Sequence, residues 1–302
     1  MKDMKSSSKA GIFLAVLAAA LYATNAPFSK LLLAYVPPTL MAGLLYLGAG
    51  LGMGVVFLLR KARRIPSKEA PLTGADRPYV LGMILLDIAA PICLLIGLRT
   101  TSAAGAALLN NFEIVATALI ALLLFRERIA PRLLAGILFV TLSCALLSLD
   151  SIAELQLSVG SLFILLACLC WGLENNCTRR LSEKDPLQIV LLKGIFSGGG
   201  SLVIGLCIGE RFAAPVYIPA VLGVGFVAYG LSIFFYVYAQ RLLGAARTSA
   251  YYAVAPFIGA LLSLVIFREL PPVHYAVALG LMVIGAFLCA SDMPLFRRNR
   301  RP

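Results

Sequence analysis

Two related halves make up this chain, and the repetition limits its fold more than any single motif does. Residues 97–150 align with residues 239–292 at a constant offset of 142, and matches within residues 11–50 have an offset of 149. Pairs matched at the second offset include Tyr22 with Trp171, Ser29 with Thr178 and Lys30 with Arg179. Duplicated membrane helices are typical of secondary transporters, in which the substrate site lies where the repeats meet.

The composition indicates a membrane protein. Of the 302 residues, 61% are hydrophobic and 13% are charged, against about 45–50% and 25% in soluble domains. A helix that crosses a bilayer needs roughly 20 apolar residues. Ten stretches approach this length, and with approximate ends they are 11–34, 39–59, 78–98, 101–125, 131–149, 158–178, 187–208, 217–240, 244–267 and 272–291. We therefore predict an all-α integral membrane protein with ten transmembrane helices and no soluble domain.

The basic residues predict how these helices are oriented. Apart from Lys30 and Lys193, 21 lysines and arginines fall on one side of the predicted membrane and only Arg99, Arg211 and Arg268 on the other. Basic residues gather on the cytoplasmic side, so both termini are predicted to be cytoplasmic. Each copy has five helices, an odd number, so the second copy must enter from the opposite side. The predicted architecture is two inverted five-helix repeats, 1–154 and 155–302, around a central cavity.

The sequence lacks the residue patterns of most enzymes and metal sites. It has no GxxxxGK[ST] phosphate loop, and His274 is its only histidine, which argues against ATP-driven pumping and against a serine–histidine–aspartate triad. All seven cysteines lie within predicted spans, and none is spaced with a histidine as metal ligands are. We expect no enzyme activity, no cofactor and no metal. The net charge of +12 follows the membrane topology, so no nucleic-acid partner is expected.

Several short motifs, taken together with the repeat, resemble one family of transporters. The first predicted helix carries LYATNAPFSK at 21–30, the second copy carries CWGLEN at 170–175, and Phe-Arg-Glu recurs at 125–127 and 267–269. Over its whole length the chain resembles the EamA-type permeases of the drug/metabolite transporter superfamily. The resemblance implies a bacterial inner-membrane exporter of amino acids and related metabolites, with ten helices in a basket around the cavity.

Five ionisable residues are predicted at membrane depth, where a charge costs roughly 2.5–3.5 kcal/mol at a helix centre and usually faces a cavity or another charge. They are Lys30, Asp87, Glu113, Glu174 and Lys193. Glu113 shares a predicted helix face with Asn110 and Thr117, so it is a substrate ligand, a proton carrier or part of an interhelical hydrogen-bond clamp. Burial favours the uncharged form of a carboxyl group, which makes Glu113 the first candidate for a coupled proton.

Glu174 and Asn25 occupy matching positions in the two copies, and each follows an aromatic residue by three positions, Trp171 and Tyr22. Symmetry predicts that both sets face the repeat interface. A carboxylate beside an aromatic ring can hold an organic ammonium through charge and cation–π attraction. The alternative is that Glu174 pairs with Arg179 or extends to the cytoplasmic surface.

Asp87 lies four residues before Pro91, which cannot donate to the carbonyl of residue 87. A carboxylate beside a free carbonyl suits a cation or a proton, and the alternative is a purely structural kink. Tyr229 stands at the matching position in the second copy, and Tyr252 matches Asn110. One wall of the predicted pocket is therefore polar and the opposite wall aromatic, which suits a zwitterionic or partly apolar metabolite.

The two lysines at membrane depth have open roles. Lys193 either binds a substrate carboxylate, neutralises Glu174 or Asp87, or extends to the cytoplasmic surface. Lys30, near the outer end of the first helix, is expected to extend to the surface. Glycines at 48, 50, 52 and 54, and at 194, 198 and 199, predict close helix packing, and they also permit one repeat to slide on the other.

These features predict a secondary transporter that exports amino acids or related zwitterionic or amphipathic metabolites by alternating access, with a proton as the candidate coupling ion. The residues expected to bind substrate are Asp87, Asn110, Asn111, Glu113, Lys193, Tyr229 and Tyr252, with Tyr22, Asn25, Trp171 and Glu174 in the cytoplasmic half. The expected partners are a small-molecule substrate and the lipid bilayer. The alternatives are efflux of lipophilic cations, an integral-membrane enzyme and a non-transporting helical scaffold.

Overall fold

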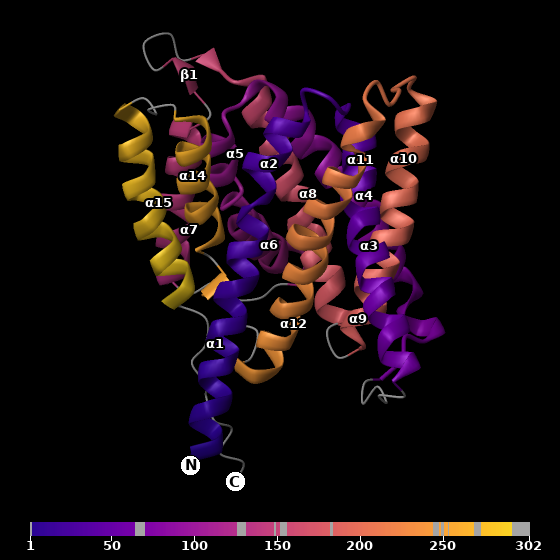
Figure 1. Cartoon of the computed structure of the whole chain (residues 1–302). Helices are drawn as coiled ribbons and strands as arrows, with labels where there is room; N and C mark the ends of the chain where they lie inside the picture. Colours follow the sequence, from indigo (N-terminus) through magenta and orange to yellow (C-terminus); the bar gives the residue numbers. More distant parts are fainter. Residues whose placement is uncertain are drawn as a thin grey trace.

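The computed structural model describes residues 2–63, 70–125, 131–147, 149–151, 156–181, 184–243, 248, 251–252, 254–268 and 273–291. The helices run side by side in one bundle (Figure 1). Its outer surface is apolar and its interior carries polar groups: Leu85 is 64% exposed, whereas Asp87, two residues further on, is 1% exposed. An apolar exterior of this kind is stable in lipid and would be costly in water.

Most described residues of the first half are in helices. Its elements are α1 (Lys2–Ala23), α2 (Asn25–Leu32), α3 (Pro38–Ala62), the 3-10 turn η1 (Gly74–Asp76), α4 (Arg77–Thr100), α5 (Ala103–Leu109), α6 (Phe112–Phe125), α7 (Pro131–Leu147) and β1 (Leu149–Ser151). The strand β1 pairs antiparallel with β2 (Gln156–Leu157) in a short ladder beside the helices, and the predicted all-α class is confirmed.

The second half begins at this ladder. After β2 its elements are α8 (Val159–Leu181), α9 (Pro186–Leu192), the π-helix η2 (Lys193–Ser197), α10 (Gly198–Cys207), the 3-10 turn η3 (Pro215–Tyr217), α11 (Ile218–Gly225), the π-helix η4 (Phe226–Leu231), α12 (Ser232–Leu243), α14 (Ala255–Phe267) and α15 (Val273–Ser291). The first turn of α1 and the last turn of α15 lie at the same end of the bundle (Figure 1).

Length and composition indicate a multi-pass membrane protein. Six described segments are long and apolar enough to cross a bilayer: Lys9–Leu32, Pro38–Ala62, Gly74–Thr100, Val159–Thr178, Pro186–Cys207 and Pro215–Ala239. Three shorter apolar helices accompany them: Leu134–Leu146, Ala255–Phe267 and Val273–Leu288. The count of ten spans and the cytoplasmic position of the termini stay predictions.

The predicted span 101–125 is two helices rather than one. Asn110 and Asn111 form a turn between α5 and α6, in which Asn111 N donates to Leu108 O and Glu113 N donates to Asn110 O, both at 3.1 Å. These shorter-range bonds tighten the chain and interrupt the α-helical ladder. The chain also turns at Thr24, between α1 and α2, and at Val254, just before α14. Three of the helices are therefore interrupted inside the bundle.

Two further spans contain a π-helix, which widens the turn and rotates the residues that follow it. The segments η2 and η4 both pack on α3. Glycines allow this close approach, because a Cβ on Gly50 would lie 2.9 Å from the carbonyl carbon of Gly194. The glycines of the two halves thus meet in one seam along α3, as the close-packing interpretation of the sequence expects.

Packing between the halves is reciprocal. The helix α4 packs on α8 as α12 packs on α1, and α6 packs on α8 as α14 packs on α1. Three further contacts pair equivalent predicted spans directly: α3 with η2 and α10, α5 with α14, and α7 with α15. This is the pattern expected from the two-fold relation that the sequence predicts, and the relation itself stays a prediction.

Polar and aromatic contacts join the helices at the end of the bundle where α2 ends. Lys30 Nζ donates to Leu98 O at 2.6 Å and to Thr101 O at 2.8 Å, which caps the last turn of α4. A third acceptor, Arg99 O at 3.0 Å, is exposed, so the ammonium reaches the end of the bundle and binds protein carbonyls there, and its extension to the membrane surface stays a prediction. Tyr35 also stacks on Tyr217, with ring centroids 4.0 Å apart.

Candidate functional site

A buried ion cluster lies where α3, α4, α8 and η2 meet. Lys193 Nζ lies 2.7 Å from Glu174 Oε1 and 3.2 Å from Asp87 Oδ2. The Tyr46 hydroxyl donates to Asp87 Oδ1 at 2.7 Å, and the Thr178 hydroxyl donates to Glu174 Oε1. Asp87, Glu174 and Lys193 are at most 6% exposed. We call these five residues the charge cluster.

The charge cluster decides between the roles that the sequence left open for Lys193 and Glu174. Neither Lys193 nor Glu174 extends to the cytoplasmic surface, because the two side chains bind each other inside the bundle. The side chain of Arg179, the other partner considered for Glu174, lies outside the described residues. Lys193 instead neutralises Glu174 and Asp87 together, which is the role that the burial of all three groups favours.

The charges of the cluster do not balance. Two carboxylates share one ammonium, so the fully ionised cluster carries one net negative charge. Burial costs several kcal/mol per ion and is offset only by close pairing and additional hydrogen bonds. The Lys193–Asp87 contact is the longer of the two, and Asp87 Oδ2 has no hydrogen-bond partner among the described residues. Asp87 is therefore the less compensated carboxylate.

Glu113 forms a second polar group beside this cluster. Asn175 Nδ2 donates to Glu113 Oε1 at 2.7 Å and to Thr117 Oγ1 at 3.2 Å, which links α6 to α8. Glu113 is close enough to Glu174 and Lys193 to interact with them electrostatically. In the described part of the chain, however, no cation lies within ion-pair distance of it, so its bonded neighbours are neutral.

An uncharged counterpart of the charge cluster lies on α2 and η4. Asn25 Nδ2 donates to the Tyr229 hydroxyl at 3.1 Å, and the Ser29 hydroxyl donates to Asn25 Oδ1 at 3.0 Å. At the offset of 149 Asn25 corresponds to Glu174 and Ser29 to Thr178, and at the offset of 142 Asp87 corresponds to Tyr229. We call Asn25, Ser29 and Tyr229 the neutral cluster. The same local arrangement thus occurs twice, with ionised groups in one copy only.

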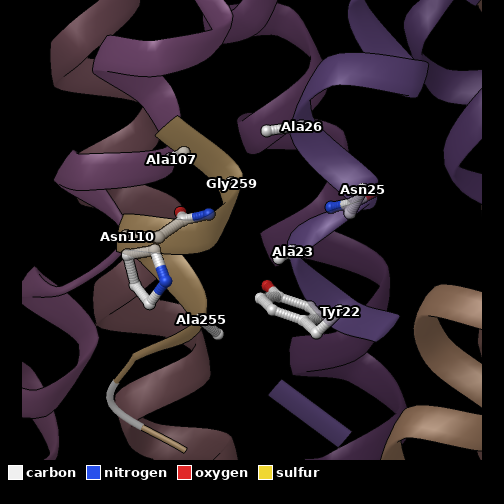
Figure 2. Close-up of a pocket in the computed structure, with 9 residues that line it drawn as sticks. Tyr22, Ala23, Asn25, Ala26, Ala107, Asn110, Ala255 and Gly259 are labelled. Atoms are coloured by element: carbon white, nitrogen blue, oxygen red, sulfur yellow. The ribbon is translucent and has the colours of Figure 1, made fainter. Parts of the chain in front are cut away.

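A pocket lies next to the neutral cluster. Its walls come from the three interrupted helices, and its lining residues are Tyr22, Ala23, Asn25, Ala26, Ala107, Asn110, Ala255, Pro256 and Gly259. Figure 2 shows Tyr22 and Asn25 reaching from α1 and α2 toward the Asn110 amide across the gap. The cavity volume is about 10 Å³, room for about one water molecule, whereas typical ligand pockets measure roughly 300–1,000 Å³. In this conformation the pocket is too small to hold a metabolite.

Tyrosine rings connect the pocket to the charge cluster. Tyr22 lies 6.0 Å from both Tyr229 and Tyr252, measured between ring centroids, and Tyr46 lies 5.0 Å from Tyr229. Tyr252 also packs on Tyr236 at 4.8 Å. The aromatic group expected from Tyr229 and Tyr252 therefore also includes Tyr22 and Tyr46, which lie in the predicted spans 11–34 and 39–59.

The structure brings most of the predicted site residues into this region. Two of them have other surroundings: Trp171 packs in the apolar core, and the buried amide of Asn111 has no hydrogen-bond partner among the described residues. Sequence reasoning missed Tyr46 and Asn175. The signal for Asn175 was its place beside Glu174, whereas Tyr46 lies in a glycine-rich helix with no acidic neighbour that would mark it.

Comparison with known proteins decides the family. The profile of the "EamA-like transporter family" matches residues 9–149 and again residues 158–291. The chain belongs to the EamA-like transporter family. One relative, an "Uncharacterized transporter" of Methanothermobacter thermautotrophicus, is 25% identical over 283 residues, which cover 88% of this chain and 82% of the relative. A second, the "Uncharacterized transporter YyaM" of Bacillus subtilis, is 21% identical over 68% of this chain and 70% of its own length.

A solved crystal structure shares the fold of this EamA-like chain. It is 19% identical in sequence, has a TM-score of 0.63, and the similarity covers 98% of both chains. At this identity the likeness concerns the fold alone. The family and the names of the two relatives indicate a multi-pass membrane transporter with a small-molecule substrate, which is not an enzyme.

Proposed function

We propose that this protein is a secondary transporter that exports amino acids or related small zwitterionic metabolites across the inner membrane of a bacterium. The pocket at three helix interruptions, next to buried charges, is the observation that carries the proposal. Interrupted helices near the middle of the membrane form the substrate sites of many transporters, because their unpaired backbone groups and side chains can bind polar substrates. Export, rather than uptake, follows from the family resemblance.

The chemistry of the pocket suits a small zwitterion. The amides of Asn25 and Asn110 and the hydroxyl of Tyr22 offer neutral hydrogen-bonding groups. Small residues, Ala23, Ala26 and Gly259, leave room for an apolar side chain. Glu113 interacts electrostatically with Tyr22, so its carboxylate is close enough to the pocket to attract an ammonium group. In this proposal Glu113 contacts the substrate once the pocket widens.

The two halves, 1–154 and 155–302, are proposed to be the units that move during alternating access. Three observations support this assignment: the reciprocal packing, the two separate profile matches, and the repeated hydrogen bonds of the charge and neutral clusters. The pocket has to widen toward one side at a time. Rocking of inverted repeats about the shared site is the usual way in which such a change occurs.

Efflux of lipophilic cations is the second candidate, and one observation favours it. Lys193 would repel a cation if its ammonium projected alone into the cavity, but two carboxylates neutralise it. The rings of Tyr22, Tyr229 and Tyr252 then offer faces that attract organic cations. The two candidates make different demands on the site. A zwitterion needs a hydrogen-bond donor on the protein for its carboxylate, whereas a lipophilic cation does not.

Thermal shifts separate these two candidates at low cost. Purified protein in detergent is heated with single amino acids, such as L-leucine and L-phenylalanine, and with tetraphenylphosphonium as a lipophilic cation. A stabilising ligand raises the melting temperature according to its affinity. Stabilisation by amino acids alone supports the first candidate, and stabilisation by tetraphenylphosphonium alone supports the second.

Flux measurements test the proposed role of Glu113. In proteoliposomes, Glu113→Gln should abolish saturable flux of the stabilising compound while the protein stays folded. Glu210→Gln is a matched control, because Glu210 accepts hydrogen bonds from the backbone N–H groups of Thr39 and Leu40, away from the pocket. Normal flux in the Glu113 variant would remove this residue from the mechanism.

A further inference from the structure

We propose that Asp87, rather than Glu113, is the carboxylate that takes up the coupling proton, and that Lys193 is a fixed internal counter-ion that makes this exchange reversible. This inference rests on the proposed transport function and specifies its coupling site. It separates the proton site from the substrate pocket. Three features of the cluster support it: its charge imbalance, the lack of a hydrogen bond at Asp87 Oδ2 among the described residues, and its connection to the pocket.

The charge imbalance favours binding of one positive charge at the cluster. With Asp87, Glu174 and Lys193 ionised, the set carries a net charge of −1 inside an apolar bundle. One proton brings the net charge to zero, and a neutral cluster is less costly to enclose than a charged one. A conformational change that seals the cluster from water is therefore easier in the protonated state.

The geometry selects Asp87 over Glu174 within the cluster. Glu174 Oε1 accepts from both Lys193 and Thr178. Asp87 Oδ1 accepts from Tyr46, but Asp87 Oδ2 has only the longer 3.2 Å ion pair and no hydrogen bond among the described residues. A proton from water can form an O–H bond at Oδ2 and break the Asp87–Lys193 ion pair, while Lys193 keeps Glu174. The reverse step returns the proton to water on the other side.

A continuous set of contacts connects Asp87 to the pocket. The Tyr46 hydroxyl binds Asp87, the Tyr46 ring packs on the Tyr229 ring, and the Tyr229 hydroxyl accepts from Asn25, which lines the pocket. Protonation of Asp87 weakens the charge-assisted bond to Tyr46. The resulting displacement of Tyr46 reaches Asn25 through one other residue.

The groups around Asp87 that can carry charge are few. Tyr46 faces it from α3, Lys193 from η2 and Glu174 from α8. Tyr229 on η4 and Cys177 on α8 also interact with it electrostatically. The phenols and the thiol are uncharged in ordinary conditions, so the balance of charge at Asp87 depends on Lys193 and Glu174.

Infrared difference spectroscopy tests the proton site without any substrate. Purified protein in detergent is titrated with acid, and the stretching band of protonated carboxyl groups is followed. Because the chain has 14 Asp and Glu residues and acid protonates all of them, spectra of the variants are compared to isolate single components of the band. One component should be present in the wild type and in Glu113→Gln and missing in Asp87→Asn. Asp87→Glu keeps a carboxyl group, so it should shift the band rather than remove it. Loss of the band in Glu113→Gln with retention in Asp87→Asn would overturn the proposal.

Flux measurements then test the connection to the pocket. L-Leucine and tetraphenylphosphonium serve as probes in proteoliposomes with and without a pH gradient. Tyr46→Phe should keep the infrared band and lose at least half of the stimulation by the gradient, whereas Tyr251→Phe, at an exposed position, should retain it. Full stimulation in Tyr46→Phe would overturn the connection. Absence of flux for both probes would count against the proposed cargo, while the infrared result would still decide the proton site.

Discussion

The charge cluster and the neutral cluster both combine residues of the two halves, at positions that match between the repeats, yet only one of them contains ionised groups. In both, a hydroxyl four residues further along the helix donates to the central residue, Thr178 to Glu174 and Ser29 to Asn25. In the neutral cluster Asn25 bonds Tyr229 directly, whereas the equivalent carboxylates, Glu174 and Asp87, are joined by Lys193. At the offset of 149 the position of Lys193 corresponds to Leu44, which is buried and apolar.

This difference shows how a duplicated framework can divide two tasks. An asparagine–tyrosine bond needs no counter-ion and leaves a neutral wall for the pocket. The carboxylates need Lys193, because a buried charge without a partner is far more costly than a buried amide. Substitutions that exchange features between the two clusters therefore test whether the division is real.

The largest effect is expected from Lys193→Met, which leaves two buried carboxylates without their cation. Breaking a buried ion pair costs about 3–5 kcal/mol. The single tryptophan, Trp171, allows unfolding in detergent to be followed by fluorescence. Leu44→Met at the equivalent position is the control, and an apolar exchange of similar volume should cost less than about 1.5 kcal/mol. Equal losses in the two variants would mean that charge does not distinguish the clusters.

The origin of this loss can be checked in the same experiment. Adding Asp87→Asn and Glu174→Gln to Lys193→Met removes the unpaired charges and should recover most of the stability. If the triple variant is as unstable as Lys193→Met alone, the loss comes from packing around the methionine rather than from the carboxylates.

A smaller but clear loss is expected from Gly194→Ala, next to Lys193 in the seam with α3. The added Cβ would collide with the backbone of Gly50 and lie 2.8 Å from Tyr46 O, and overpacking of this kind costs about 1–3 kcal/mol. Gly199→Ala is the matched control, because no atom lies within 4 Å of its added Cβ. A similar melting temperature for both variants would show that the helices of the seam can move apart without loss of stability. The seam would then not be what fixes the position of Lys193.

The sequence predicted the framework of this comparison but not its connections. The two offsets aligned Glu174 with Asn25 and Asp87 with Tyr229, because duplication preserves spacing within helices. The direction of Lys193 was not predictable, since the π-helix that begins at this residue breaks the 3.6-residue periodicity. The interruption at Asn110 and Asn111 was missed for a related reason: neither glycine nor proline marks it. Contacts between distant helices, such as Tyr46 with Asp87, leave no periodic signal.

In the neutral cluster, Tyr229→Phe should have a moderate effect. It removes the acceptor of Asn25 Nδ2 and leaves a buried donor unpaired, which costs about 1–3 kcal/mol. Tyr251→Phe, where the tyrosine is 36% exposed, should change the melting temperature little. A loss as large as that of Lys193→Met would contradict the view that the neutral cluster avoids the cost of charge.

The smallest effect on stability is expected from Asp87→Asn, although it removes a charge from the centre of the bundle. Lys193 keeps its shorter bond to Glu174, the amide oxygen can face Lys193 while the amide nitrogen donates to the Tyr46 hydroxyl, and the cluster becomes electrically balanced. Replacing a poorly compensated buried charge by a neutral group of the same shape is close to neutral or stabilising. The free energy of unfolding should therefore change by less than about 1 kcal/mol, which is measured as a small shift in melting temperature. Glu174→Gln should cost more, since it weakens the 2.7 Å bond and leaves Lys193 only the 3.2 Å contact. The reverse order would mean that Asp87, rather than Glu174, holds Lys193 in place.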